Sequence, residues 1–566
     1  MQVQLYDTTL RDGSQREGLS LSAEDKVKIA RELDALGIHY IEGGWPGSNP
    51  KDAEFFQKIQ QVELKNAKIA AFGSTRHAKN TCDDDPNIRA LVEANTPVIT
   101  LVGKSSTLHV VKVLETTLDE NLRMIGDSVA YFKQLGKEVV YDAEHFFDGY
   151  KLDSEYAVET ITAAARAGAD VIVLCDTNGG SLPAEVEQAI KMVREHLILN
   201  CKLQIAGNGD SNLQSAIYNL QLGIHTHNDG ALAVANAMAA VQAGCVQVQG
   251  TINGYGERCG NMDLIPLIAN LQIKQGYQCV DQAQLRRLSE VSHYVAAIAN
   301  INPDTHAPYV GRSAFAHKGG IHVAAIAKVA ESYQHIDPEW VGNELRVVVS
   351  ELAGRGNVRM RAEALGLILN GNERAVLQRI KELESGGFQF EAAEGSFEML
   401  VRRASPDYVA PFELLDFTVI VEKRGSNQVM SQATVKLRVG AEVMHTAAEG
   451  DGPVNALDQA IRKALVPHYP ILAEVHLVDY KVRIVDEHLG TAAKPRVLIE
   501  SARGEERWST VGCSENIIEA SWQALWDSLE LPLLRSVVTR PSSVADNRPE
   551  SVAQQTADHE PRTDAV

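Results

Sequence analysis

Short apolar runs alternate with amphipathic stretches from residue 2 to about residue 253. The apolar runs are rich in Val, Ile, Tyr and Phe, which is typical of buried strands. The stretches between them carry apolar residues at helical spacing, and one, "SAEDKVKIARELDALG", has Ser22 as a candidate N-cap and Gly37 as a candidate stop. The eight candidate strands are "VQLYDTT", "YIEGG", "KIAAFGS", "VITLVGK", "EVVYDAEHF", "VIVLCDTNG", "GIHTHND" and "VQVQGTING".

This alternation of eight strands with helices predicts a (β/α)8 barrel over residues 1–275. A doubly wound open sheet is the alternative, but it usually has fewer strands, and no GxGxxG sequence follows the first strand. Residues 200–221 do not fit the repeat. We interpret them as an insertion between the sixth helix and the seventh strand.

The pattern changes after the predicted barrel. Residues 276–394 are rich in helical patterns and predict a helical linker subdomain. Residues 395–534 combine four strand candidates with two helix candidates, which predicts a separate α+β domain. Residues 535–566 contain no Leu, Ile or aromatic residue, so they cannot bury enough apolar surface to fold, and we expect a disordered tail.

Composition excludes several classes of partner. The formal net charge is −20, so we expect neither nucleic acid nor an anionic membrane as a partner. No apolar run approaches the ~20 residues of a membrane-spanning helix, and the N-terminus has no signal-peptide pattern. Seven scattered cysteines without a CxxC pair indicate a reducing compartment, and we expect a cytoplasmic protein.

The run "LGIHTHNDGA" contains the candidate chemistry. On a strand, His225 and His227 point to the same face, and the end of a barrel strand is where barrel active sites lie. Two hydrogen-bonded core histidines are the alternative interpretation. The first strand favours a metal site, because it ends in Arg11 and Asp12, and a charge inside a barrel is costly unless it is paired or bound to metal. Asp12 and the two histidines would form an O,N,N ligand set for Mn, Mg, Zn or Co, with Asn261 as a candidate fourth ligand.

Three motifs carry a family resemblance. "DTTLRDGSQ", "GIHTHND" and "NGYGERCGN" resemble the signatures of the metal-dependent superfamily of 2-isopropylmalate, homocitrate and citramalate synthases and 3-hydroxy-3-methylglutaryl-CoA lyases. The C-terminal part is similar to the regulatory and dimerisation domain of the synthases, which the lyases lack. The segments "YIEGGWPGSNPKDAEFF" and "FAHKGGIHVAAIAK" resemble the citramalate synthase branch. The resemblance implies a homodimer that condenses acetyl-CoA with pyruvate, on a route to isoleucine.

The resemblance also implies catalytic residues. Glu144, His322 and Tyr333 are the groups that it places near the acetyl methyl proton, and which of them acts as the general base stays open. His322 and Tyr333 lie beyond the barrel, so they would reach the site from the linker subdomain, as would the competing candidate His317. Arg11 keeps its proton at working pH and is expected to stabilise the developing oxyanion, with an ion pair to Asp12 as the alternative.

Further residues are predicted to contact or shape the substrate pocket. Thr177 either donates to the substrate carboxylate or caps the following turn. Glu42 is expected to bind substrate, with Trp45 and Pro46 restricting the size of the pocket. Asp142 departs from the family pattern, because citramalate synthases can carry a bulky residue at this position, two before Glu144. The departure puts the selection of substrates by size in doubt.

The C-terminal domain is expected to bind an amino-acid end product. A tight loop of Gly450, Asp451, Gly452 and Pro453 precedes a helix, where backbone amides could meet the carboxylate of isoleucine, or of leucine in the isopropylmalate branch. The remaining alternatives are a 2-isopropylmalate synthase acting on 2-oxoisovalerate, a carbon–carbon lyase, and a non-catalytic regulator. The lyase is disfavoured because the lyases lack the C-terminal regulatory domain, and because Cys259 is not assigned the role of the catalytic cysteine that they carry in this loop.

Overall fold

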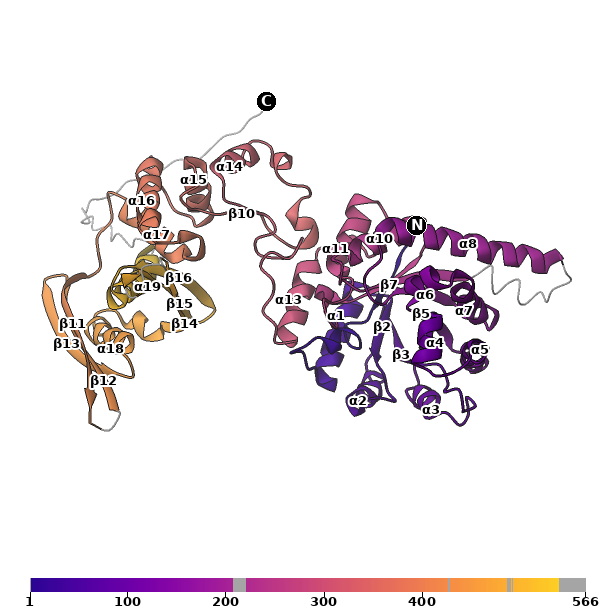
Figure 1. Ribbon diagram of the computed structural model, residues 1–566. Helices are drawn as coiled ribbons and strands as arrows, with labels where there is room; N and C mark the ends of the chain where they lie inside the picture. Colours follow the sequence, from indigo (N-terminus) through magenta and orange to yellow (C-terminus); the bar gives the residue numbers. More distant parts are fainter. Residues whose placement is uncertain (1, 207–219, 426–427, 486–489, 491, 539–566) are drawn as a thin grey trace, which may run out of the picture. The chain divides into compact units, whose positions relative to one another are not determined.

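The computed structural model describes residues 2–206, 220–425, 428–485, 490 and 492–538 (Figure 1). These residues form two compact units. The first comprises Met1–Ala316 and Tyr333–Arg346, and the second comprises His317–Ser332 and Val347–Val566. No helix in the described part of the chain is long and apolar enough to cross a membrane.

The first unit contains a closed barrel of parallel strands in sequential order, which confirms the predicted (β/α)8 barrel. The barrel closes where β1 pairs with β8, with Gln4 opposite Gln247 and Asp7 opposite Gly250. The strands are β1 (Gln4–Asp7), β2 (Tyr40–Gly44), β3 (Lys68–Ser74), β4 (Val98–Lys104), β5 (Glu138–Glu144), β6 (Val171–Asp176), β7 (Gln221–Thr226) and β8 (Gln247–Gly250).

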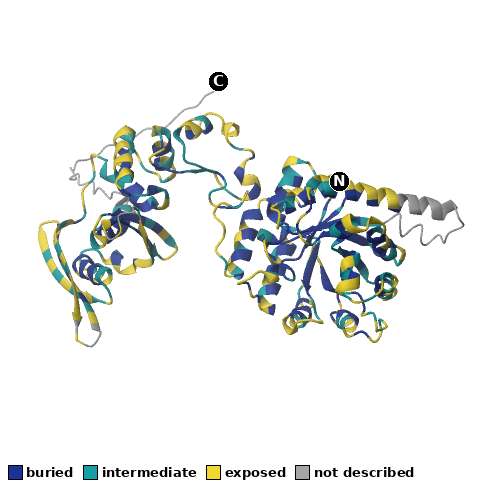
Figure 2. Ribbon diagram, viewed as in Figure 1, coloured by how far each residue is buried: buried dark blue, intermediate teal, exposed yellow. Residues whose placement is uncertain are grey.

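Helices surround these strands, and the strands are buried except at some of their ends (Figure 2). The predicted limits of the first helix are confirmed, because Ser22 accepts the backbone N–H of Asp25 in a capping box and Gly37 ends the helix at a φ of 91°. The helices are α1 (Ala23–Leu36), α2 (Pro50–Ile59), α3 (Pro86–Glu93), α4 (Thr107–Lys112), α5 (Leu118–Gln134), α6 (Phe146–Leu152), α7 (Ser154–Arg166), α8 (Pro183–Ala206), α10 (Ala233–Ala243), α11 (Leu264–Ala269), α12 (Gln282–Leu285) and α13 (Leu288–Ile298).

Two apolar clusters stabilise the barrel. The larger one joins the outward-facing strand residues to the helices. The smaller one contains only strand residues, and because side chains alternate between the two faces of a strand, these point into the barrel. Its members are Tyr6, Tyr40, Ala70, Val98, Val140, Val171, Val173 and Cys175. Since the interior is filled by these side chains, it supports the polar side chains at the C-terminal ends of the strands from below.

The second unit begins with helices and continues as the predicted α+β domain. Its helices before the sheets are α14 (Gly320–Ile326), α15 (Arg355–Ala364), α16 (Glu373–Ser385) and α17 (Glu394–Arg403). The α+β part has two three-stranded antiparallel sheets, each followed by a helix that packs against it. Its elements are β11 (Glu413–Arg424), β12 (Gln428–Val439), β13 (Glu442–Gly450), α18 (Pro453–Leu465), β14 (His476–Ile484), β15 (Pro495–Arg503), β16 (Glu506–Cys513) and α19 (Ile517–Val538).

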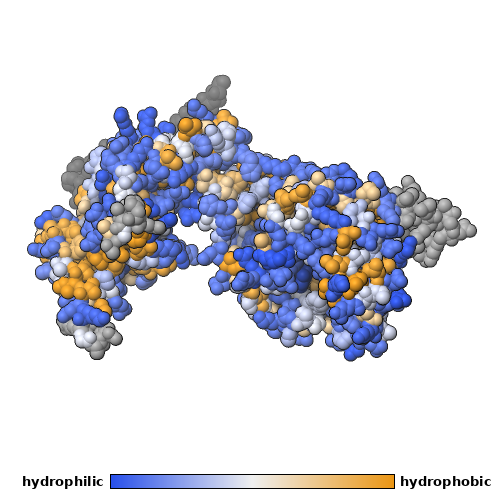
Figure 3. Space-filling model, viewed as in Figure 1, coloured by the Kyte–Doolittle hydropathy of each residue, from blue (hydrophilic) through white to orange (hydrophobic). Residues whose placement is uncertain are grey.

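Apolar residues gather on the surface over the β11–β13 sheet (Figure 3). Ile420 and Val421 on β11, Val429 on β12 and Val443 on β13 are all exposed there. Because consecutive strand residues point to opposite faces, Ile420 and Val443 lie on one face of the sheet, and Val421 and Val429 lie on the other.

Two of the sequence expectations fall partly on residues that the structure does not describe. The predicted insertion at 200–221 begins inside α8, which runs to Ala206, and ends at the start of β7, while residues 207–219 lie outside the described residues. Similarly, α19 runs to Val538, and residues 539–566 of the predicted tail lie outside the described residues.

Candidate metal centre

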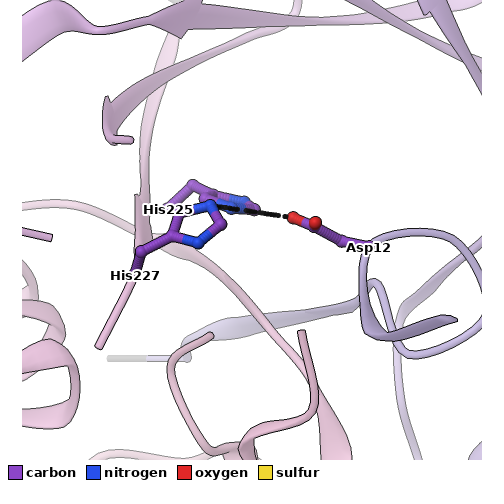
Figure 4. A group of neighbouring side chains, drawn as sticks. All are labelled: Asp12, His225 and His227. Carbon is purple, nitrogen blue, oxygen red and sulfur yellow. Dashed lines mark hydrogen bonds and ion pairs between the residues drawn. The ribbon is translucent and has the colours of Figure 1, made fainter. Parts of the chain in front are cut away.

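Asp12, His225 and His227 come together at the C-terminal end of the barrel, and their side chains point toward one another (Figure 4). The Nε2 atom of His225 lies 3.3 Å from Oδ2 of Asp12 and 3.3 Å from Nε2 of His227. The Nε2 atom of His227 lies 3.9 Å from the same carboxylate oxygen. All three residues are buried, and their ligand atoms lie within 4.8 Å of one another. This is the O,N,N group that the strand pattern predicted.

The backbone explains how these groups meet. His225 lies on β7 with Thr226 after it, so His227 continues the same strand direction and faces the same side. Asp12 follows β1 in a turn that leads into a 3₁₀ helix, Gly13–Gln15. Only β8 separates β1 from β7 in the closed barrel, so Asp12, in the turn after β1, can reach His225 on β7.

The electrostatics of the group suit a cation. Burial on its own would raise the pKa of Asp12, but the guanidinium of Arg11 and the hydrogen bond from His225 outweigh it and hold this pKa well below its usual range. Burial, together with the charge of His225, lowers the pKa of His227 to about 3. For His225 the hydrogen bond to Asp12 outweighs burial and raises the pKa. The group therefore combines a carboxylate with a neutral imidazole, the forms in which these side chains bind metals.

Asn261 supplies a test of whether a metal ion fits. Its backbone pairs with that of His227, and its side chain is buried. Neither amide atom of Asn261 has a hydrogen-bond partner among the described residues, and the same is true of Nδ1 of His227. Leaving a buried amide unpaired is costly, so an additional polar group is expected beside it. A divalent ion, with its bound water, fits both this amide and the O,N,N donor set.

Arg11 is held rigidly beside the group. Its Nε donates to Oε2 of Glu42 at 2.6 Å, its Nη1 lies 3.5 Å from Oδ2 of Asp12, and its guanidinium lies 3.9 Å above the ring of Phe72. Burial acts to lower the pKa of Arg11, but Asp12 and Glu42 outweigh it and raise this pKa. The guanidinium is thus a permanent positive charge with a fixed orientation.

Glu42 occupies a different place from the one that its predicted role suggests. It is fully buried, and it accepts hydrogen bonds from Arg11 and, at 2.8 Å, from the hydroxyl of Tyr6. It is absent from the residues that line the cavity described next. Its contacts are those of a residue that orients Arg11, while direct contact with substrate stays a prediction.

A cavity of about 920 Å³ opens above the group. Six of the residues predicted from the sequence to bind metal, react or contact substrate line it: Arg11, Asp12, Glu144, Thr177, His225 and His227. Trp45, which was predicted to restrict the pocket, lines it together with Asp142, whereas Pro46, predicted for the same role, is absent from the lining. Burial and the charge of Glu42 raise the pKa of Asp142 to about 7.

Glu144 ends β5 and forms a close ion pair with Lys104, which ends the neighbouring strand β4. Both side chains line the cavity. Thr177 lies after β6, where its hydroxyl accepts the backbone N–H of His145 at 2.8 Å and its carbonyl accepts from Arg258 at 2.7 Å. Either predicted role of Thr177 stays a prediction.

The residues that were predicted to reach the site from the linker subdomain lie in different units of the structure. His322 lies on α14 of the second unit, and His317 lies just before this helix in the same unit. Tyr333 belongs to the first unit and is exposed, and it is absent from the residues that line the cavity. The barrel residues therefore assemble without them, and the catalytic roles of His322 and Tyr333 stay predictions.

Sequence reasoning missed Lys104, Gln249 and Arg258. Lys104 and Arg258 line the cavity, and Gln249 bonds directly to His225. A signal for Gln249 was present, because an amide in the middle of the buried strand "VQVQG" needs a partner inside the barrel. Lys104 could have been found as the only charge in the candidate strand "VITLVGK".

Comparison with known families and proteins identifies the chain's relatives. Residues 2–295 match the HMGL-like family, 309–387 match the homocitrate synthase post-HMGL domain-like family, and 391–532 match the LeuA allosteric (dimerisation) domain. The (R)-citramalate synthase of Geobacter sulfurreducens is 51% identical over 538 residues, which cover 94% of this chain and 98% of that protein. The (R)-citramalate synthase of Synechocystis sp. is 50% identical over 94% of this chain and 96% of that protein.

The chain belongs to the citramalate synthase family. A probable 2-isopropylmalate synthase of Methanopyrus kandleri is 30% identical, over 92% of this chain and 96% of that protein. Membership of the citramalate synthase family confirms an enzyme with a barrel catalytic domain and a C-terminal allosteric domain. It also agrees with Asp12, His225 and His227 as the group that binds a metal in HMGL-like enzymes.

Proposed function

We propose that this chain condenses acetyl-CoA with pyruvate to give (R)-citramalate and CoA. The acetyl methyl carbon loses a proton and bonds to the ketone carbon of pyruvate, while the C=O π bond opens and its oxygen takes up a proton to become a hydroxyl. Water then cleaves the thioester, which leaves a carboxylate and releases CoA. The observation that carries the proposal is the sequence identity of 51% and 50% to two (R)-citramalate synthases, over 94% of the chain. The cavity supports it, because its lining includes both the metal-binding group and Glu144.

We assign metal binding to Asp12, His225 and His227, with Asn261 as the fourth ligand, directly or through water. A bound divalent ion (Mn, Mg, Zn or Co) would supply Lewis acidity to the ketone of the 2-oxo acid. Arg11 would stabilise the negative charge that develops on the ketone oxygen, since its guanidinium is fixed by Glu42 and lines the cavity. A charge held in place before the reaction costs no reorganisation during it.

Proton removal from acetyl-CoA is assigned to Glu144. Its carboxylate lies at the cavity wall in an ion pair with Lys104, which restricts where it can point. Thr177 is proposed to donate to the carboxylate of pyruvate. His322 and Tyr333 are proposed to complete the site from the partner subunit of a homodimer.

The homodimer and its location in the cytoplasm are part of the same proposal. The C-terminal domain matches a family described as dimerisation domains, and its β11–β13 sheet carries exposed apolar residues. A homodimer would cover exposed apolar groups of this kind. The cysteines whose side chains the structure describes form no disulfide, which supports a cytoplasmic location.

The identity of the 2-oxo acid is tested by a substrate panel. Release of CoA is measured with acetyl-CoA, a divalent metal and pyruvate, 2-oxoisovalerate, 2-oxoglutarate or no 2-oxo acid. We expect kcat/KM for pyruvate to exceed that for 2-oxoisovalerate at least about 100-fold, because one to three kcal/mol separates ligands that differ by a methylene in an apolar pocket, and these two differ by more.

The alternative substrate has one observation in its favour. Asp142 lines the cavity where a bulky residue would restrict its size. Trp45 lines the same cavity, and its ring packs against that of Phe72 at a centroid distance of 5.5 Å. A preference for 2-oxoisovalerate in the panel would keep the chemistry and overturn pyruvate as the substrate in favour of a 2-isopropylmalate synthase.

We propose isoleucine as the effector of the C-terminal domain, bound at the loop from Gly450 to Pro453. A Cβ on Gly450 would meet the backbone nitrogen of Ala456 at 2.5 Å, so glycine is required where β13 approaches α18. Gly452 caps α18 in an extended conformation, and a Cβ there would meet nothing within 4 Å. The space in front of the helix is therefore open to a ligand or to a larger side chain.

Gly452→Tyr is expected to fill that space without strain. The ratio of the rates with and without saturating isoleucine should change by at least about 5-fold relative to the wild type, the lower end of typical allosteric couplings. The measurement is CoA release across an isoleucine titration, with leucine as the comparison effector. An unchanged inhibition curve in Gly452→Tyr would contradict the assignment of this loop.

A further inference from the structure

A chain of hydrogen bonds crosses the interior of the barrel behind the metal-binding group. The Nδ1 atom of His225 lies 2.9 Å from Oε1 of Gln249, and the Nε2 amide of Gln249 donates to Oδ1 of Asp142 at 3.0 Å. These three side chains come from β7, β8 and β5. All are buried, so water does not compete for these bonds.

The chemistry of the chain determines which nitrogen of His225 carries the proton. In its ionised form Asp142 only accepts hydrogen bonds, so it selects the NH₂ end of the Gln249 amide, and the amide oxygen then faces His225. An amide oxygen only accepts, so the Nδ1 of His225 must be the donor. The other nitrogen, Nε2, faces Asp12 and His227, so it is the nitrogen left to bind a metal ion once it gives up the proton that it shares with Asp12.

We infer that Gln249 and Asp142 are positioning residues that hold His225 in the tautomer and orientation needed to bind a metal through Nε2. The register supports this, because Gln249 lies directly opposite His225 in the β7–β8 pair. Asp142 lies two residues before Glu144 on β5, so the same strand that anchors the metal ligand also carries the proposed base. The inference rests on the metal site of the proposed function and on no step of the condensation.

Five proteins test the inference: the wild type, Gln249→Met, Asp142→Leu, Asp142→Asn and Gln247→Met. We call the hydrogen-bond chain from His225 through Gln249 to Asp142 the relay. Gln249→Met and Asp142→Leu each remove one of its polar groups and put an apolar side chain in its place. Asp142→Asn retains an oxygen that can accept from Gln249, so it should rescue the relay. Gln247→Met is the matched control, because Gln247 is fully buried on the same face of β8 and makes no bond to His225.

The readouts are the Kd of Mn²⁺, from the EPR signal of the free ion, and the visible absorption spectrum of the Co²⁺ protein. Losing a partner that orients a metal-binding histidine typically weakens metal affinity 10- to 100-fold. We expect a loss of about this size in Gln249→Met and Asp142→Leu, with an altered Co²⁺ spectrum. Asp142→Asn and Gln247→Met should stay within about threefold of the wild type.

The result can be separated from the fate of the proposed function. Weaker Mn²⁺ binding in Gln249→Met and Asp142→Leu, found while the wild type condenses no 2-oxo acid, would support the relay and overturn the proposed condensation. Gln249→Met that binds Mn²⁺ as tightly as Gln247→Met, with the Co²⁺ spectrum of the wild type, would overturn the relay alone. A wild type that binds neither Mn²⁺ nor Co²⁺ would overturn the metal site and the relay together.

Discussion

Asp12→Asn is expected to remove both metal binding and turnover. The asparagine keeps the shape of the side chain but loses the negative charge that the two histidines and Arg11 face. Metal polarisation of a carbonyl is worth several kcal/mol, and each 1.36 kcal/mol is tenfold in rate. We therefore expect CoA release to fall at least about 1,000-fold, with the bound metal of the purified protein reduced in parallel.

The matched control for this substitution is Asp7→Asn. Asp7 is fully buried on β1, five residues earlier, and it accepts hydrogen bonds from the backbone N–H and the hydroxyl of Thr9. Burial raises the pKa of Asp7 to about 7, so loss of its charge is tolerated near neutrality. Asp7→Asn should bind metal as the wild type does. Full activity in Asp12→Asn would contradict the assignment of the ligands.

Glu144→Gln is expected to abolish proton removal while leaving the metal bound. Glutamine preserves the size of the side chain but cannot accept a proton, and general base catalysis typically contributes 10²- to 10⁴-fold. The substitution should lower kcat by about that factor. The incorporation of solvent deuterium into the methyl group of acetyl-CoA, followed by mass spectrometry, measures the proton step apart from CoA release.

Glu138→Gln is the control on the same strand. Glu138 begins β5 at the opposite end of the barrel, where it bonds to Tyr40 and Lys68, and it does not line the cavity. Its substitution should leave deuterium incorporation unchanged. If Glu144→Gln retains more than a tenth of the wild-type exchange, the general base is another group, and His322 and Tyr333 become the candidates.

The barrel and the metal-binding triad were predictable from the sequence because they depend on simple periodicities. Strand and helix patterns alternate eight times, and His225 and His227 are two apart on a strand, so they must share a face. Asp12 was predictable because a charge in a buried strand end needs a partner. Closure of the barrel then brings the ends of β1 and β7 together.

The supporting residues were harder to predict because their partners are far apart in the chain. Glu42 holds Arg11 across 31 positions, and Gln249 reaches Asp142 across 107. A sequence pattern shows that such residues are polar and buried, but it does not say which partner satisfies them. The role expected for Glu42 shows the consequence, since the structure joins this residue to Arg11 and Tyr6 and leaves it out of the cavity wall.

The central claim is that this chain is a metal-dependent synthase acting on pyruvate. The most direct test uses protein stripped of metal by a chelator and then dialysed, supplied with acetyl-CoA and pyruvate, with and without added Mn²⁺. The account predicts no CoA release without metal, and with metal an equimolar formation of CoA and (R)-citramalate, identified by chiral chromatography. Equal rates with and without metal, or CoA released without citramalate, would contradict it.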